Sequence, residues 1–178
     1  YTKIITTPQT RALAELTLHN SVSLLKKEVD DKDFELYNHD EVDLLIKMIS
    51  YKEYENQFEL NSFHQYKDSN VNATFYNAGH ILGSAGILLE NKDYKIFYTG
   101  DINLANQTLI PAAKLPEAKI DTLILETTYG ATDSGLLLDR NSESLRLAKE
   151  ANKILNKGGS ILIPVFSLGK MQEILATI

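Results

Sequence analysis

Residues 73–101 read Ala-Thr-Phe-Tyr-Asn-Ala-Gly-His-Ile-Leu-Gly-Ser-Ala-Gly-Ile-Leu-Leu-Glu, then a polar turn, then Lys-Ile-Phe-Tyr-Thr-Gly-Asp. β-branched and aromatic residues separated by Gly and Asn predict three short strands, at 74–76, 87–90 and 95–99. His80 follows the first strand, and Asp101 follows the third. Small residues beside a His and an Asp let backbone and ligand come close, as a metal site requires.

The composition limits which chemistry the chain can carry. Its 178 residues suffice for a sizeable core, and 43% are hydrophobic. It has no cysteine, so disulfides and thiolate zinc sites are excluded, and a metal must use His, Asp or Glu. The net charge of −6 gives no basic footprint for nucleic acid. No apolar run is long enough to cross a membrane and no signal segment is visible, so we expect no membrane partner and a cytoplasmic location.

Upstream of this stretch the pattern predicts a strand over residues 1–6 and a helix over 8–28, with Pro8 at its first position. A second helix is expected to be capped by Asp40. A strand is expected near residues 58–60. The predicted buried stripes of the two helices are Leu13, Leu16, Val22 and Leu25, then Val42, Leu45, Ile46 and Ile49.

Downstream, the apolar runs 120–125 and 160–166 predict two buried strands. Between them, Asn141 is the expected cap of a helix that ends at Gly158-Gly159, with Leu145, Ala148, Ala151 and Leu155 turned inward. A last helix begins near Lys170. The mixture predicts an α/β or α+β fold with sheet layers and outer helices. Both ends fall inside predicted elements, which suggests an internal fragment of a longer chain.

Three side chains at strand ends are candidates for chemistry. His80 is either a zinc ligand or a loop histidine that bonds to backbone. Asp101 is either a carboxylate that bridges two metal ions or the acceptor of an Asx-turn. Glu126 ends the 120–125 run, where it is either an active-site carboxylate that orients a histidine or a residue that reaches solvent or nearby backbone.

Other polar groups have simpler interpretations. We expect the remaining histidines to be surface or helix-cap residues: His19, His39 and His64. Lysines at 149, 153 and 157 share one helix face, which is typical of a solvated surface, with phosphate contact as the alternative. Gly169-Lys170 at a helix start is a weak phosphate-binding signal.

Taken in order, five segments resemble motifs of the β-CASP branch of the metallo-β-lactamase fold, and RNA endonucleases of pre-mRNA cleavage and polyadenylation in particular. They are Ile-Thr-Thr-Pro-Gln-Thr at 5–10, Ala-Gly-His-Ile-Leu-Gly-Ser-Ala at 78–85, Tyr-Thr-Gly-Asp at 98–101, Glu-Thr-Thr-Tyr-Gly at 126–130 and Ile-Pro-Val-Phe-Ser-Leu-Gly-Lys-Met-Gln-Glu at 163–173. The likeness covers nearly the whole chain, and its specificity comes from the order and spacing of the motifs.

The resemblance implies part of an αββα sandwich over residues 1–130 and the start of a β-CASP cap domain over 131–178. By it, His80 is a ligand of one zinc ion, Asp101 is the ligand that bridges two, and Glu126 orients a catalytic histidine. The implied reaction is two-metal hydrolysis of RNA phosphodiester bonds. DNA is the other substrate that the resemblance allows, and a homodimer is a further expectation.

The chain also departs from that family. The family's His-x-His-x-Asp-His motif, which supplies most metal ligands, is absent here, and the segment Gly135-Leu136-Leu137-Leu138 stands where relatives carry charge. Two other functions therefore stay open. One is a non-catalytic scaffold with a decayed site, against which the retained His80, Asp101 and Glu126 argue. The other is a small-molecule hydrolase such as a thioesterase, against which the motifs at 126–130 and 163–173 argue.

The isolated 178-residue chain should neither bind zinc tightly nor cleave RNA, because two side-chain ligands cannot hold a two-zinc site. Elemental analysis of the purified, dialysed chain measures its zinc content. A stoichiometric amount of zinc would contradict the expectation.

Overall fold

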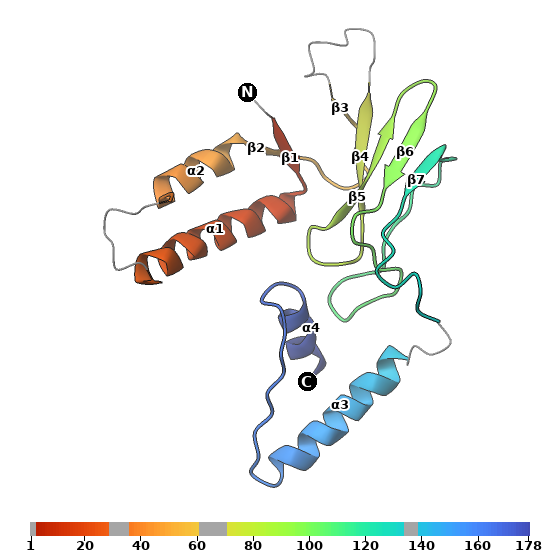
Figure 1. Cartoon of the computed structure of the whole chain (residues 1–178). Coiled ribbons are helices and arrows are strands. Elements are labelled where there is room, and N and C mark those ends of the chain that lie inside the picture. The colour runs from red at the N-terminus through yellow and green to blue at the C-terminus, as the bar shows by residue number, and fades with distance from the viewer. Residues whose placement is uncertain (1–2, 29–35, 61–70, 134–138) are drawn as a thin grey trace.

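The computed structural model describes residues 3–28, 36–60, 71–133 and 139–178 (Figure 1). Its elements run in the order β1 (Ile4–Thr6), α1 (Pro8–Glu28), α2 (His39–Met48), β2 (Ile49–Tyr51), β3 (Phe58–Glu59), β4 (Asn72–Asn77), β5 (Ala85–Glu90), β6 (Lys95–Tyr98), β7 (Thr122–Ile124), α3 (Arg140–Leu155) and α4 (Lys170–Thr177). The mixed α/β character expected from the sequence is confirmed.

A five-stranded sheet in the order β3-β4-β5-β6-β7 forms the centre of the chain. β3 to β6 are antiparallel, and β7 joins β6 in parallel. The register aligns Phe75, Ile87, Tyr98 and Ile124 across four strands, so these residues share one face. The three strands predicted between residues 73 and 101 are β4, β5 and β6.

A smaller unit, at the left of Figure 1, joins α1 and α2 to a parallel pair of strands, β1 and β2. Its core is built from both helices and β2: Val22, Val42, Ile46 and Ile49. Helix α1 begins at Pro8 as predicted, since Thr7 Oγ1 accepts from the N–H of Thr10 at 3.2 Å.

Two details of these helices were predicted wrongly. Asn38 caps α2 instead of Asp40, because the Asn38 side chain accepts from the N–H of Glu41 while the Glu41 carboxylate accepts from the N–H of Asn38. Leu16 is 66% exposed and Leu45 37% exposed. Neither residue belongs to the core cluster or packs against it as a partly buried neighbour.

Helix α3 also differs from the prediction. Its cap is Asp139, whose carboxylate accepts from the N–H of Ser142, and not Asn141. Of the predicted inward residues only Ala151 is buried, whereas Leu145 is 72% exposed. In Figure 1, α3 projects away from the five-stranded sheet, so the sheet does not cover it. The part of α3 that is partly covered holds Ser144, Leu147, Ala148 and Ala151.

The two predicted buried strands are not buried. Within 120–125 only the three residues of β7 are paired, and Leu123 is 57% exposed because β7 has a described neighbour on one side alone. Residues 160–166 form no strand, and Leu162 is 94% exposed. An apolar run becomes a strand only where another strand offers its backbone groups, and the described ranges supply none here.

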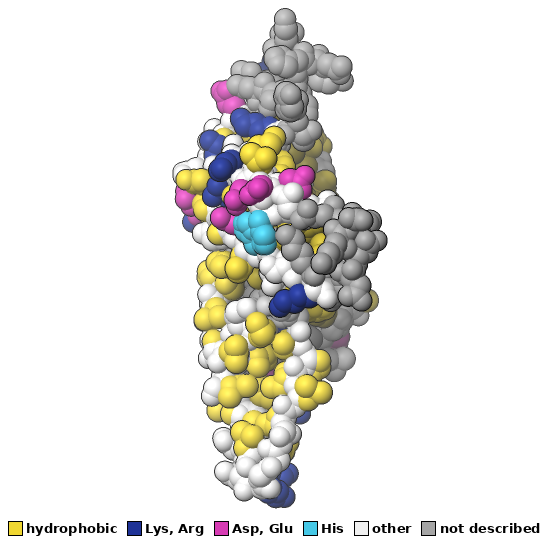
Figure 2. Space-filling model, turned by 90° about the vertical axis from the view of Figure 1, so that its left-hand side faces the viewer, with side chains coloured by type: hydrophobic (Ala, Val, Ile, Leu, Met, Phe, Trp, Pro, Cys, Tyr) yellow, Lys and Arg dark blue, Asp and Glu magenta, His cyan; other side chains and the backbone are white. Residues whose placement is uncertain are grey.

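Exposed apolar side chains are a general feature of the surface. Figure 2 shows one face on which they spread over a broad area below the charged and histidine side chains. Among the described residues, no helix is long and apolar enough to cross a membrane.

Replacing Ile46 with Ala should lower the free energy of unfolding by about 2–5 kcal/mol, because the side chain is 4% exposed and its loss leaves a cavity in the α1–α2 core. The matched control is Leu44→Ala on the same helix, where the side chain is 60% exposed and the change should stay within about 0.5 kcal/mol. Urea unfolding measures both, and equal losses would contradict the assignment of the core.

Candidate metal centre

The His80 turn, residues 79–84, connects β4 to β5 and presents the first candidate ligand. Its backbone needs glycine at both ends, with φ of +70° at Gly79 and +84° at Gly83. A Cβ on Gly79 would lie 2.4 Å from the amide nitrogen of Ala113 and 2.4 Å from the carbonyl oxygen of Asn103. The turn is therefore packed directly against the loop that follows β6.

Side-chain oxygens organise the backbone of the His80 turn. Ser84 Oγ accepts from the N–H of His80 and of Ile81, each at 3.2 Å. Asn77 Oδ1 accepts from the N–H of Gly79 at 2.9 Å. These bonds hold the histidine backbone in place, while the His80 side chain stays 38% exposed. His80 is thus a rigidly supported residue with an accessible imidazole.

Asp101 stands opposite His80 at the end of β6. Its Oδ2 lies 3.8 Å from His80 Nε2, and its side chain is 75% exposed. The separation exceeds a hydrogen bond. A zinc ion, which lies about 2.0–2.2 Å from nitrogen and oxygen ligands, fits between two such atoms. The donor types and their separation therefore suit two of the ligands of one ion.

Glu126 follows β7 and uses its carboxylate to hold backbone. One oxygen accepts from the N–H of Ile102 and the other from the N–H of Thr128, both at 3.0 Å. The Thr128 side chain, these two N–H groups and nearby His80 lower the pKa of Glu126 against a small opposing effect of burial. Because Ile102 is next to Asp101, an ionised Glu126 fixes the segment that carries Asp101.

The pair His80–Asp101 does not make a complete site. Over residues 3–28, 36–60, 71–133 and 139–178, no group of three His, Cys, Asp or Glu side chains is placed to hold a metal ion. The structure thus brings together the three residues predicted from sequence. The possible metal ligands His80 and Asp101 face each other, and Glu126 supports the backbone beside Asp101.

The other candidates lie elsewhere. His19 Nδ1 is 2.7 Å from His39 Nδ1, and His19 Nε2 is 3.2 Å from a carboxylate oxygen of Asp43, so these histidines link α1 to α2 at the surface. His64 lies outside the described residues, as does the segment 135–138. Lys149 and Lys153 are exposed on α3, as expected of a solvated face, whereas Lys157 is exposed but lies beyond the end of the helix. The N–H of Gly169 already donates to Gln172 Oε1 at 2.8 Å, which removes it from phosphate binding.

Gln107, which contacts the backbone of His80, was not predicted from the sequence. Gln107 Nε2 donates to the carbonyl oxygens of Gly79 at 2.7 Å and of His80 at 2.9 Å. Gln107 lies in a polar loop without periodicity, and no local pattern distinguishes a glutamine that bonds to distant backbone from one that faces solvent.

No family model matches the chain, but individual proteins of similar sequence do. The chain is 46% identical over 110 residues to an "RNase J-like protein" of Methanocaldococcus jannaschii, and 30% identical over 173 residues to "Cleavage and polyadenylation specificity factor subunit 3" of Dictyostelium discoideum. The chain belongs to the β-CASP branch of the metallo-β-lactamase superfamily. A third relative, "Probable RNase MJ4" of M. jannaschii, is 35% identical over 175 residues.

These alignments cover 61%, 97% and 97% of the chain, but only 26%, 21% and 38% of the three relatives. The chain thus corresponds to a minor part of each longer protein. Other relatives carry the name endoribonuclease, which agrees with the ribonuclease class expected from the motifs.

Glu126 should make the stability of the chain depend on pH. A carboxylate whose pKa is lowered in the folded state stabilises that state above its unfolded pKa of about 4.3, and the stabilisation is lost as pH falls through the lower folded value. Urea unfolding from about pH 6 to pH 3 should therefore show stability falling with acid, and less steeply in Glu126→Gln. The control is Glu15→Gln on an exposed part of α1. Equal slopes in wild type and Glu126→Gln would contradict the role of this carboxylate.

Proposed function

We propose that these residues belong to a zinc-dependent β-CASP ribonuclease that hydrolyses RNA phosphodiester bonds. The observation that carries the proposal is the pair of facing donors, His80 Nε2 and Asp101 Oδ2, 3.8 Å apart on two strand ends. Support comes from relatives along almost the whole chain that are named as RNases or as a cleavage factor subunit.

In this proposal, His80 and Asp101 would be two of the residues that hold the zinc ions, His80 as a ligand of one ion and Asp101 as a shared carboxylate ligand. Two zinc ions would supply a hydroxide nucleophile near neutral pH and would neutralise charge on the phosphate. Glu126 holds the backbone beside Asp101, through the N–H of Ile102. The remaining ligands would come from residues outside these 178.

We also propose the fold that membership of this family implies. Residues 1–130 form part of an αββα sandwich, and 131–178 begin the β-CASP cap domain. The five-stranded sheet supports the first part, because both of its faces carry apolar side chains, such as Phe75 on one and Leu88 on the other. The cytoplasm is the proposed location, and neither a DNA substrate nor a homodimer has an observation in its favour.

The test is RNA cleavage by the full-length protein that contains this chain. Asp101→Ala and His80→Ala should each lower kcat/KM on the order of 100-fold or more, since each removes a metal ligand. Glu126→Gln should lower it roughly 10–100-fold, as expected for a residue that supports a ligand. Asp93→Ala is the matched control, because Asp93 is an exposed carboxylate in the turn between β5 and β6.

The same measurement separates the alternatives. Full-length protein that binds no zinc and cleaves no RNA would favour a non-catalytic scaffold. Cleavage that Asp101→Ala leaves unchanged would refute the proposed metal site. Hydrolysis of thioesters without cleavage of RNA would favour a small-molecule hydrolase.

A further inference from the structure

We infer that Gln107 is a positioning residue for His80, and that Glu173 and Arg140 hold Gln107 in that position. The inference rests on the proposed function only in that it takes His80 as a metal ligand. It adds a link between the His80 turn and the helices α3 and α4.

The first step is the contact between Gln107 and the His80 turn. The two N–H groups of its side-chain amide meet two successive carbonyl oxygens, those of Gly79 and His80, at 2.7 and 2.9 Å. Ser84 Oγ holds the N–H of His80 from the other side. The peptide groups on both sides of the His80 Cα are thereby bonded to side chains, which restricts the direction in which its imidazole can point.

The second step is what holds residues 107–109, here called the Gln107 loop. The two residues after Gln107 donate their N–H groups to one carboxylate, Thr108 to Glu173 Oε2 at 2.8 Å and Leu109 to Glu173 Oε1 at 2.9 Å. Arg140 Nη2 donates to Glu173 Oε2 at 2.8 Å and to Thr108 Oγ1 at 2.9 Å. Both carboxylate oxygens of Glu173, on α4, thus hold the Gln107 loop. Arg140, the first residue of α3, bonds to both Glu173 and Thr108.

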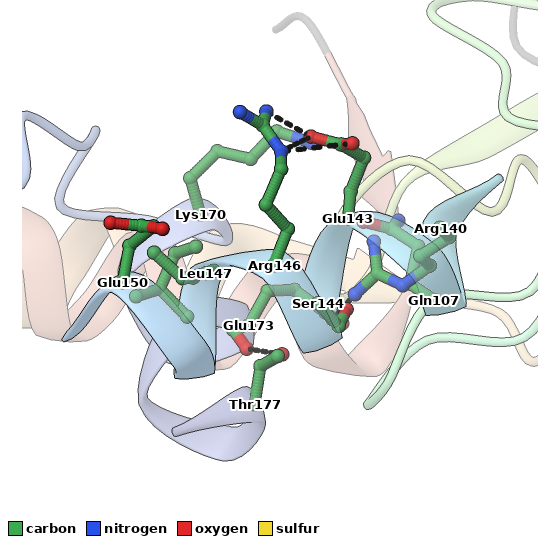
Figure 3. A pocket seen from close by; sticks show the side chains of 11 residues that line it. Gln107, Arg140, Glu143, Ser144, Arg146, Leu147, Glu150, Lys170, Glu173 and Thr177 are labelled. Carbon is green, nitrogen blue, oxygen red and sulfur yellow. Dashed lines mark hydrogen bonds and ion pairs between the residues drawn. The ribbon is translucent and has the colours of Figure 1, made fainter. Parts of the chain in front are cut away.

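The Glu173 carboxylate is buried, with the residue 6% exposed. Burial raises its pKa, but the N–H groups of Leu109 and Thr108 and the charge of Arg140 outweigh this effect and lower it. A buried carboxylate satisfied at both oxygens is rigid and expensive to disrupt. Figure 3 shows Gln107 and Arg140 together at one end of a cavity of about 440 Å³ that α3 and α4 line.

A separate contact brings α4 against the same turn. Gly169, just before α4, has φ of +86°, and a Cβ on it would lie 2.6 Å from Cγ2 of Ile81. Helix α4 therefore meets the His80 turn directly at Ile81 and indirectly through Glu173 and the Gln107 loop. A shift of α4 would be transmitted to the backbone of His80 by both routes.

The first test compares Gln107→Ala with Gln57→Ala in the full-length protein. Gln57 is a suitable control, because its amide is exposed and, among the residues that the structure describes, donates to the side chain of Glu90. Gln107→Ala should weaken zinc binding and lower kcat roughly 10–100-fold, as expected when a group that orients a ligand is lost, with KM for RNA little changed. A competing chromophoric chelator measures the zinc affinity.

Hydrogen exchange makes the test independent of catalysis. In Gln107→Ala the amides of residues 79–84 should exchange faster than in wild type, whereas Gln57→Ala should leave them unchanged. If wild-type protein binds no zinc, the proposed function fails, and the exchange rates still decide whether Gln107 holds the turn. Exchange and zinc affinity in Gln107→Ala equal to those of Gln57→Ala would overturn the inference.

A second pair of variants tests the anchor. Glu173→Gln cannot accept at both oxygens, so it should accelerate exchange at Thr108, Leu109 and the His80 turn and weaken zinc binding severalfold. The matched control is Glu150→Gln, because Glu150 lines the same cavity from α3. A variant with Glu173→Gln that lowers the melting temperature but leaves exchange in residues 79–84 and zinc affinity unchanged would show a merely structural carboxylate and would overturn this part of the inference.

Discussion

The carbonyl group of Gly83 connects the unit that contains α1 and α2 to the five-stranded sheet. It accepts hydrogen bonds from the hydroxyl groups of Thr7 at 2.8 Å and of Thr10 at 2.9 Å, and Thr7 is 2% exposed. Two donors on one buried oxygen leave neither partner free to move without exposing an unsatisfied polar group. The first turn of α1 is thereby fixed to the turn that carries His80.

The contacts of residues 79–84 explain why so much of the chain converges there. Besides α1, the turn is reached by Tyr54, whose hydroxyl donates to the carbonyl of Ser84 at 2.9 Å, and by Gln107. Ile81 meets the backbone of Gly169 before α4. A ligand that must keep its direction gains from support on several sides, because each contact removes a different way in which the turn could tilt.

Local chemistry made part of this predictable from sequence. The strands β4, β5 and β6 and the placement of His80 and Asp101 at their ends follow from turn residues within a few positions. The caps of α2 and α3 were each misplaced by two residues, since Asn38 and Asp40, or Asp139 and Asn141, are equally good caps until the backbone conformation is known. The partnership of Thr108 with Glu173 spans 65 positions, and no local pattern records it. Burial of the apolar run at 160–166 failed as a prediction because burial depends on a partner and not on composition.

That run has a consequence for how the protein behaves in solution. Phe166 is 81% exposed and Leu162 94% exposed, on an extended segment whose backbone groups have no strand beside them in the described residues. Such a segment is a template on which a second molecule can add a strand, and its side chains reward the pairing. Pro164 interrupts the template at its centre, because proline offers no N–H to a neighbouring strand. Any strand that a second molecule added to this segment would therefore be shortened at Pro164, with apolar side chains exposed on either side of it.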